Sequence, residues 1–91
     1  MGISQVTDQM KKELYELLAS IQIPEDFETL FSDLCTNKEV EQMAQRVAAA
    51  KLLLDGKTYN QVIEKTDISS ATLSRVSRCV QYGKGYKSFI K

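Results

Sequence analysis

The sequence predicts an all-α fold, and three observations support this. Glycine and proline, which break helices, occur only four times and once in 91 residues. No segment alternates apolar and polar residues with the β-branched enrichment that is typical of strands. Apolar residues instead recur at spacings of three and four, which places them on one face of a helix. We expect residues 1–91 to form one domain with four segments: 1–35, 36–56, 57–82 and 83–91.

The first two helices are predicted at about residues 5–20 and from Pro24 onward. Proline suits the first turn of a helix, and Glu25 and Asp26 stand where the helix dipole favours anions. Both helices carry an apolar stripe that so small a monomer does not easily bury. The stripes consist of Val6, Met10, Leu14, Leu17, Leu18 and Ile21 in the first helix, and Phe27, Leu30, Phe31 and Leu34 in the second.

The third helix is predicted over residues 37–55 and is the longest. Thr36 and Glu39 have the spacing of a capping box, and Gly56 is a good stop signal. Because this helix is apolar around much of its circumference, we expect it to be central to the core. The residues predicted on its main apolar face are Val40, Met43, Ala44, Val47 and Leu54, and those that widen this face are Ala48, Ala49, Ala50, Leu52 and Leu53.

Two short helices follow, predicted over residues 59–65 and 71–82. Thr58 and Gln61 form a second capping box, and the connector at 66–70 ends in two serines, which are good N-caps. In the second short helix we expect Ala71, Val76 and Val80 to point inward, with Leu73 nearby. Gly83 and Gly85 end the helix, and we expect Tyr86, Phe89 and Ile90 to form a final helical turn packed on a neighbour.

The pair of short helices has the pattern of a helix-turn-helix. In this motif the second helix enters the DNA major groove, where short polar side chains meet base edges and cations meet phosphates. The alternative is a helical hairpin with a solvated polar face, although serine and threonine are mediocre helix formers for such a face. Ser77 and Gln81 extend the polar set. The residues that we predict to contact DNA are Lys57, Thr58, Tyr59, Ser69, Ser70, Thr72, Ser74, Arg75, Arg78 and Lys84.

Charge is distributed unevenly along a chain whose net charge is zero. Residues 1–35 hold two basic and seven acidic side chains, whereas residues 36–91 hold ten basic and five acidic side chains. The asymmetry indicates an anionic partner for the C-terminal half, such as double-stranded DNA. Attraction between the two halves of the chain is the alternative.

Several classes of protein are not expected. The chain has no histidine, and Cys35 and Cys79 are not spaced as a metal motif, so we predict no metal site, no catalytic site and no enzyme. No apolar run approaches the roughly 20 residues that span a bilayer, and the N-terminus does not resemble a secretory signal. We therefore expect a cytoplasmic protein with no membrane partner and with reduced cysteines.

Residues 34–80 resemble the core of the Trp repressor family, and more closely its YerC/YecD-type members from Gram-positive bacteria. The resemblance lies in Leu-x-Thr at 34–36, Arg-Val at 46–47, Leu-Leu-x-Gly at 53–56 and Ala-Thr-Leu-Ser-Arg at 71–75. It implies an intertwined homodimer with interlocked N-terminal helices. Two recognition helices would then read a palindromic operator, which is the arrangement of a DNA-binding transcriptional regulator and, we expect, a repressor. The alternative function is a helical interaction module that docks an acidic partner.

The resemblance also implies a site for a small-molecule co-repressor. Arg46 and Arg75 match the two arginines between which the Trp repressor holds tryptophan, and Thr36 matches a polar group near that ligand. Guanidinium groups suit this role because they stack on aromatic rings and pair with carboxylates. However, Val76 replaces a small glycine of the family and Cys79 replaces a hydroxyl-bearing residue. We therefore expect a ligand other than tryptophan, or none.

Overall fold

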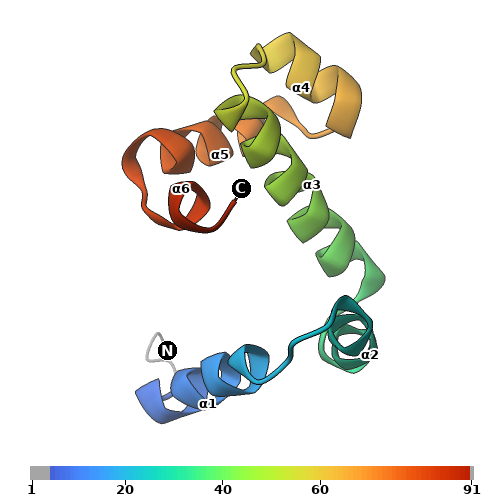
Figure 1. The fold of residues 1–91 in the computed structure, drawn as a ribbon, viewed down its shortest axis with the longest axis vertical. Coiled ribbons are helices and arrows are strands. Elements are labelled where there is room, and N and C mark those ends of the chain that lie inside the picture. Colours follow the sequence, from blue (N-terminus) through green and yellow to red (C-terminus); the bar gives the residue numbers. More distant parts are fainter. Residues whose placement is uncertain (1–4, 91) are drawn as a thin grey trace. The chain divides into compact units, whose positions relative to one another are not determined.

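A computed structural model of the chain describes residues 5–90, which contain six α-helices and no strand (Figure 1). The all-α prediction is confirmed. The chain divides into two compact units, Met1–Thr36 and Asn37–Lys91. None of the helices in the described range is long and apolar enough to cross a membrane. The helices are α1 (Asp8–Ala19), α2 (Pro24–Leu34), α3 (Asn37–Leu54), α4 (Tyr59–Thr66), α5 (Ser70–Tyr82) and α6 (Gly85–Phe89).

The N-terminal unit consists of α1 and α2. The Thr7 side chain caps α1 by accepting a hydrogen bond from the backbone N–H of Met10 at 3.1 Å, so this helix begins later than the predicted residue 5. In α2 the rings of Phe27 and Phe31 meet edge to face, with centroids 5.8 Å apart. Neither helix contains a buried residue. The predicted apolar stripe of α1 is therefore formed but uncovered.

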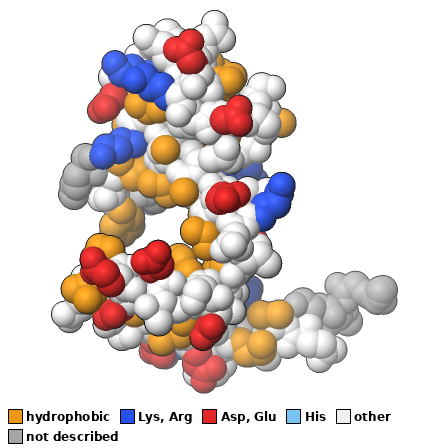
Figure 2. Space-filling view, turned by 90° about the vertical axis from the view of Figure 1, so that its right-hand side faces the viewer, with side chains coloured by type: hydrophobic (Ala, Val, Ile, Leu, Met, Phe, Trp, Pro, Cys, Tyr) orange, Lys and Arg blue, Asp and Glu red, His pale blue; other side chains and the backbone are white. Residues whose placement is uncertain are grey.

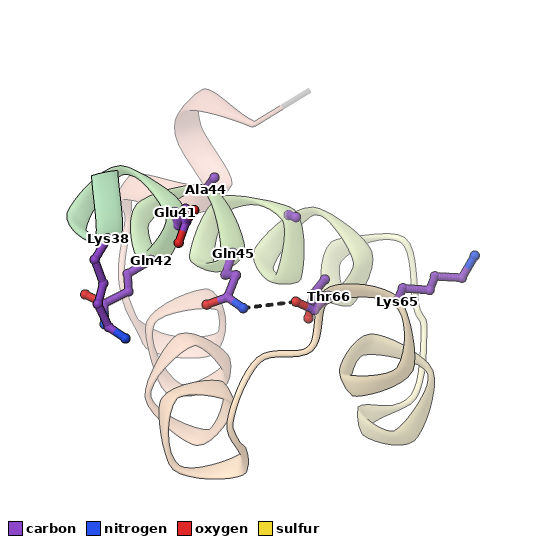
Figure 3. Close-up of a pocket in the computed structure, with 8 residues that line it drawn as sticks. Lys38, Glu41, Gln42, Ala44, Gln45, Lys65 and Thr66 are labelled. Carbon is purple, nitrogen blue, oxygen red and sulfur yellow. Dashed lines mark hydrogen bonds between the residues drawn. The ribbon is translucent and has the colours of Figure 1, made fainter. Parts of the chain in front are cut away.

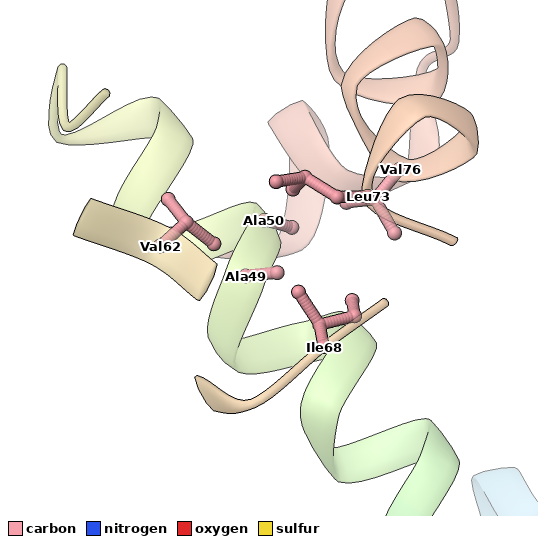
Figure 4. Close-up of a cluster of buried hydrophobic side chains, with 6 residues drawn as sticks. All are labelled: Ala49, Ala50, Val62, Ile68, Leu73 and Val76. Carbon is pink, nitrogen blue, oxygen red and sulfur yellow. The ribbon is translucent and has the colours of Figure 1, made fainter. Parts of the chain in front are cut away.

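The core of the C-terminal unit lies around the C-terminal half of α3. The helices α4, α5 and α6 gather there, and each of them contacts α3 (Figure 1). Alanine side chains on α3 let the neighbouring helices approach closely, and larger side chains from α4, α5 and the segment between them fill the space (Figure 4). The buried apolar cluster consists of Ala49, Ala50, Val62, Ile68, Leu73 and Val76.

The predicted main face of α3 is wrong in part. Val47 is 51% exposed and Leu54 is 39% exposed, whereas Ala49 and Ala50 are fully buried. Apolar residues surround much of this helix, so periodicity alone does not decide which side the short helices cover. The short helices cover the side of α3 that carries Ala49 and Ala50, whereas Ala44, Val47 and Ala48 are exposed.

Helix α4 begins at its predicted residue, and α5 begins one residue before its own. The capping box of α4 is confirmed, because Gln61 N–H donates to Thr58 Oγ1 at 3.2 Å and Thr58 N–H donates to Gln61 Oε1 at 2.9 Å. Helix α5 begins at Ser70, one residue before the predicted start, because Ser69 is its N-cap. Gly56 has a φ of +88°, a conformation that glycine adopts at little cost, and it follows the end of α3.

The C-terminal residues form the short helix that the sequence predicts. Tyr86 and Ile90 pack against the core cluster, as expected. Phe89, however, is 83% exposed, so the expectation that it packs on a neighbour within the chain is wrong. A helix of five residues has room for only one inward face, and Tyr86 and Ile90, four positions apart, occupy it.

Candidate nucleic-acid interface

Helices α4 and α5 are joined by residues 67–69, and these residues together with Thr66 at the end of α4 are called here the connector. Asp67 has φ 59° and ψ 22°, the left-handed conformation that turns the chain sharply, and its N–H donates to Ile63 O at 2.9 Å. Ile68 follows and is only 3% exposed, so the connector is anchored in the core. The result is two short helices that are joined by a tight turn and both pack on α3, as the helix-turn-helix prediction requires.

The two faces of α5 have opposite chemistry. Leu73 and Val76 are buried against α3, while the other side of the helix faces solvent. Successive exposed residues are spaced by three and four, so they form one continuous surface. No acidic residue occurs in α5. The exposed residues of this surface, called here the reading face, are Ser70, Ala71, Ser74, Arg75, Arg78, Gln81 and Tyr82.

Two details of α5 differ from the prediction. Ala71 is exposed rather than inward, because it precedes Arg75 by four positions and Arg78 by seven and so shares their side. Ser77 is 5% exposed rather than part of the polar surface, because it follows Leu73 by four positions. Its hydroxyl accepts a hydrogen bond from Gln81 Nε2 at 3.4 Å. The spacing to Arg75 and Arg78 is the signal that would have placed Ala71 correctly.

The polar groups at the N-terminus of α5 are held in place by hydrogen bonds to one another. Ser69 Oγ accepts from Thr72 N–H at 3.2 Å and donates to Thr72 Oγ1 at 2.9 Å. The Ser69 side chain therefore contacts both the backbone N–H and the hydroxyl of Thr72. The next backbone N–H groups and the positive end of the helix dipole favour an anion at this end. Ser69 and Ser70 are both exposed, whereas Thr72 is half-buried.

The remaining predicted DNA contacts flank the reading face on neighbouring segments. Lys57 and Thr58 are exposed and directly precede α4 in the sequence. Tyr59 is the first residue of that helix and is 46% exposed, and Lys84 is exposed between α5 and α6. On the face shown in Figure 2, acidic side chains gather over the N-terminal unit. This matches the seven acids and two bases of residues 1–35. The basic side chains that suit phosphates therefore belong mainly to the C-terminal unit.

Of the residues predicted to bind a ligand, Arg46 lies beside a polar cavity of about 330 Å³. Arg46 is half-buried and makes no salt bridge with any residue in the described range. Arg75 is exposed on the reading face and does not line this cavity, and Thr36 ends the N-terminal unit. The other residues that line the cavity are Gln42, Gln45, Asp67, Ile68, Ser69 and Thr72.

Two further hollows lie in the C-terminal unit. One, of about 560 Å³, runs along α3 to the end of α4 and is lined mainly by polar side chains (Figure 3). The other, of about 340 Å³, is apolar and is lined by Cys79, Gly83, Gly85, Tyr86 and Phe89. Cys35 and Cys79 are both free thiols and half-buried. Within residues 5–90, no three Cys, His, Asp or Glu side chains are grouped as metal ligands would be.

Comparison with known proteins agrees with this architecture. The family described as Trp repressor protein matches residues 9–91, which is nearly the whole chain. The chain belongs to the Trp repressor family. It is 42% identical to the uncharacterized protein YerC of Bacillus subtilis (strain 168) over 83 residues, which are 91% of this chain and 80% of YerC.

Two crystal structures are similar to this Trp repressor family member over most of their length. A candidate Trp repressor from Staphylococcus aureus superposes with a TM-score of 0.85 at 32% identity, covering 96% of this chain and 88% of the other. A TrpR-like protein from Eubacterium eligens ATCC 27750 superposes with a TM-score of 0.82 at 35% identity, covering 89% and 84%. The resemblance found in residues 34–80 is confirmed and extends to the whole fold. The family is one of DNA-binding regulators rather than of enzymes.

Proposed function

We propose that this protein is a sequence-specific DNA-binding transcriptional regulator, a repressor, that acts as a homodimer in the cytoplasm. The observation that carries the proposal is the reading face of α5. It presents short hydroxyl side chains and two arginines, and Leu73 and Val76 fix it to α3. Such a face matches the donors, acceptors and phosphates that line a major groove.

Each predicted contact has a role in this proposal. Arg75 and Arg78 bind bases or phosphates, and Ser70, Thr72 and Ser74 complete the contacts near the start of the helix. The small side chain of Ala71 lets the helix approach closely and can contact a thymine methyl group. Lys57, Thr58, Tyr59, Ser69 and Lys84 bind the flanking phosphates.

The homodimer is proposed because the N-terminal unit exposes an apolar stripe. Val6, Met10, Leu14 and Leu17 recur every three or four residues, and each is between 38% and 52% exposed. A contiguous exposed apolar surface of this kind marks an interaction site. A second copy with the same stripe supplies a matching surface under twofold symmetry. Two reading faces then address the two halves of a palindromic operator.

An effector site is proposed at Arg46, within the C-terminal unit. Arg46 is half-buried, lines a polar cavity and has no salt-bridge partner in the described range, which suits an anionic group of a small ligand. Val76 is buried where the family has a smaller residue, so tryptophan is not the ligand that we propose.

Selection of binding sites from random double-stranded DNA tests the function. We expect enrichment of a palindrome, in parallel selections with and without tryptophan. Fluorescence anisotropy with the selected site should then show affinity that falls as salt rises, because phosphate contacts release counterions. A selection that enriches no sequence would overturn the proposal in favour of a module that docks an acidic protein.

Arginine substitutions distinguish base contacts from phosphate contacts. Arg75→Ala or Arg78→Ala should cost about 1–3 kcal/mol of binding on the selected site alone if the arginine reads a base. If it binds a phosphate, all sequences should weaken alike and the salt slope should fall by about 1. Lys12→Ala, which removes a positive charge from the acidic N-terminal unit, is the control and should bind as wild type.

A further inference from the structure

Gln45 of α3 is bonded to the connector of the helix-turn-helix. Its Nε2 donates to Thr66 O at 3.1 Å and, in a longer contact, to Asp67 O at 3.4 Å. Figure 3 shows this side chain pointing from α3 to the end of α4. The partners are 21 and 22 positions away in the sequence, so these bonds join the central helix to a distant turn.

The two acceptors explain why the side chain at position 45 is an amide. Thr66 O is among the last carbonyls of α4, which have no partner within their own helix. Carbonyl oxygens only accept, so the side chain of residue 45 must donate. The C-terminal end of a helix is also negative, which disfavours a carboxylate in place of the amide.

The connector itself is internally fixed. Thr66 Oγ1 donates to Val62 O at 2.8 Å and accepts from Ile68 N–H at 3.3 Å. Ile68 is buried, and Ser69 caps α5 directly after it. These contacts fix the connector internally. The hydrogen bonds from Gln45 to Thr66 and Asp67 therefore also determine the position at which α5 begins.

We propose that Gln45 is a positioning residue for the reading face: it ties the connector to α3 and thereby sets the orientation of α5. This inference rests on the proposed DNA-binding function.

Two pairs of variants test the proposal in the full-length chain. Gln45→Met keeps the length of the side chain but donates no hydrogen bond, and Gln45→Glu keeps the shape but places a negative charge against the carbonyls. Gln42 lies one turn earlier and lines the same two hollows, and it makes no hydrogen bond within the described range. Gln42→Met and Gln42→Glu are therefore the matched controls, with the same changes of charge on the same helix.

Affinity for the selected DNA and amide hydrogen exchange are measured at a temperature where every variant is folded by circular dichroism. We expect Gln45→Met to lose about fivefold in affinity and its connector amides to exchange about fivefold faster, as for one lost hydrogen bond. Gln45→Glu should lose more than Gln45→Met, and both Gln42 variants should match wild type. Unchanged affinity in both Gln45 variants would overturn the proposal. Equal losses in the Gln42 variants would also do so, because charge or helix stability would then be the cause.

Failure of this proposal is distinguishable from failure of the proposed function. If wild type binds no DNA, the proposed function itself has failed. If wild type binds DNA and both Gln45 variants bind it equally well, only the role of Gln45 has failed.

Discussion

Asp67 adopts a conformation that most residues avoid. Its φ of 59° and ψ of 22° place it in the left-handed region, where the side chains of Asp and Asn are tolerated because they can bond locally. The turn between α4 and α5 depends on this residue, since a straight continuation of α4 would carry α5 away from α3. A β-branched side chain at this position is strained.

Asp67→Val should therefore lower the free energy of unfolding by about 1–2 kcal/mol. Urea unfolding followed by circular dichroism measures the change. Asp67→Asn is the control and should stay within about 0.5 kcal/mol of wild type, because asparagine accepts the same backbone conformation. A valine variant as stable as the asparagine variant would show that the turn relaxes at little cost.

Leu73 is the largest of the fully buried side chains in the part of the C-terminal unit that the structure describes. Leu73→Ala should cost about 2–5 kcal/mol, because it removes apolar burial and leaves a cavity under α5. Tyr82→Ala removes a larger side chain from the same helix. Since Tyr82 is 81% exposed, the cost should stay within about 0.5 kcal/mol. Thermal unfolding of both variants decides whether the cluster holds α5 in place.

At the scale of the helix, the two serines at the start of α5 have different roles. Ser69 caps the helix through Thr72 N–H, whereas the Ser70 side chain makes no hydrogen bond within the described range. Both serines are exposed, so burial does not distinguish them. The two serines are distinguished only by where each hydroxyl lies relative to the first backbone N–H groups of α5.

Ser69→Ala should cost about 1 kcal/mol of stability through the lost cap. Ser70→Ala should stay within about 0.5 kcal/mol of wild type in stability and yet bind the selected DNA more weakly. Chemical unfolding gives the first quantity and fluorescence anisotropy gives the second. The assignment fails if Ser70→Ala is the more destabilising change of the two.

At the scale of the whole molecule, the proposed dimer rests on the exposed apolar stripe of α1. A chain of 91 residues buries a smaller fraction of its surface than a larger domain does, so an interface adds burial that the monomer lacks. Met10, Leu14 and Leu17 share one side of α1, whereas Tyr15 lies off that side. A charge on the stripe should therefore act differently from a charge on Tyr15.

If the proposed dimer forms through this stripe, Leu17→Glu should convert it to a species of 10.3 kDa in sedimentation equilibrium, because a carboxylate is costly in an apolar interface. Its affinity for the proposed palindrome should fall as well, since each monomer of the proposed dimer contacts one half-site. Tyr15→Glu adds the same charge to the same helix and should remain a dimer. A dimeric Leu17→Glu would place the interface elsewhere.

Local signals in the sequence determined the helices and most of the reading face. The capping residues Thr58 and Ser69, the proline at 24 and the glycine at 56 act within one turn of the backbone, so they specify helix ends without reference to the fold. The absence of acids from α5 and its serines and arginines were likewise readable from the chain alone, together with the resemblance to the Trp repressor family.

The tertiary structure decided which sides of the helices are covered. Helix α3 is apolar around much of its circumference, so only packing by α4, α5 and α6 selected Ala49 and Ala50 over Val47. The same packing turned Ala71 outward and Ser77 inward. The bond from Gln45 to Thr66 joins residues 21 positions apart, and no local pattern predicts such a contact. Helix ends depend on neighbours within a few residues, whereas burial and long-range hydrogen bonds depend on which helices meet.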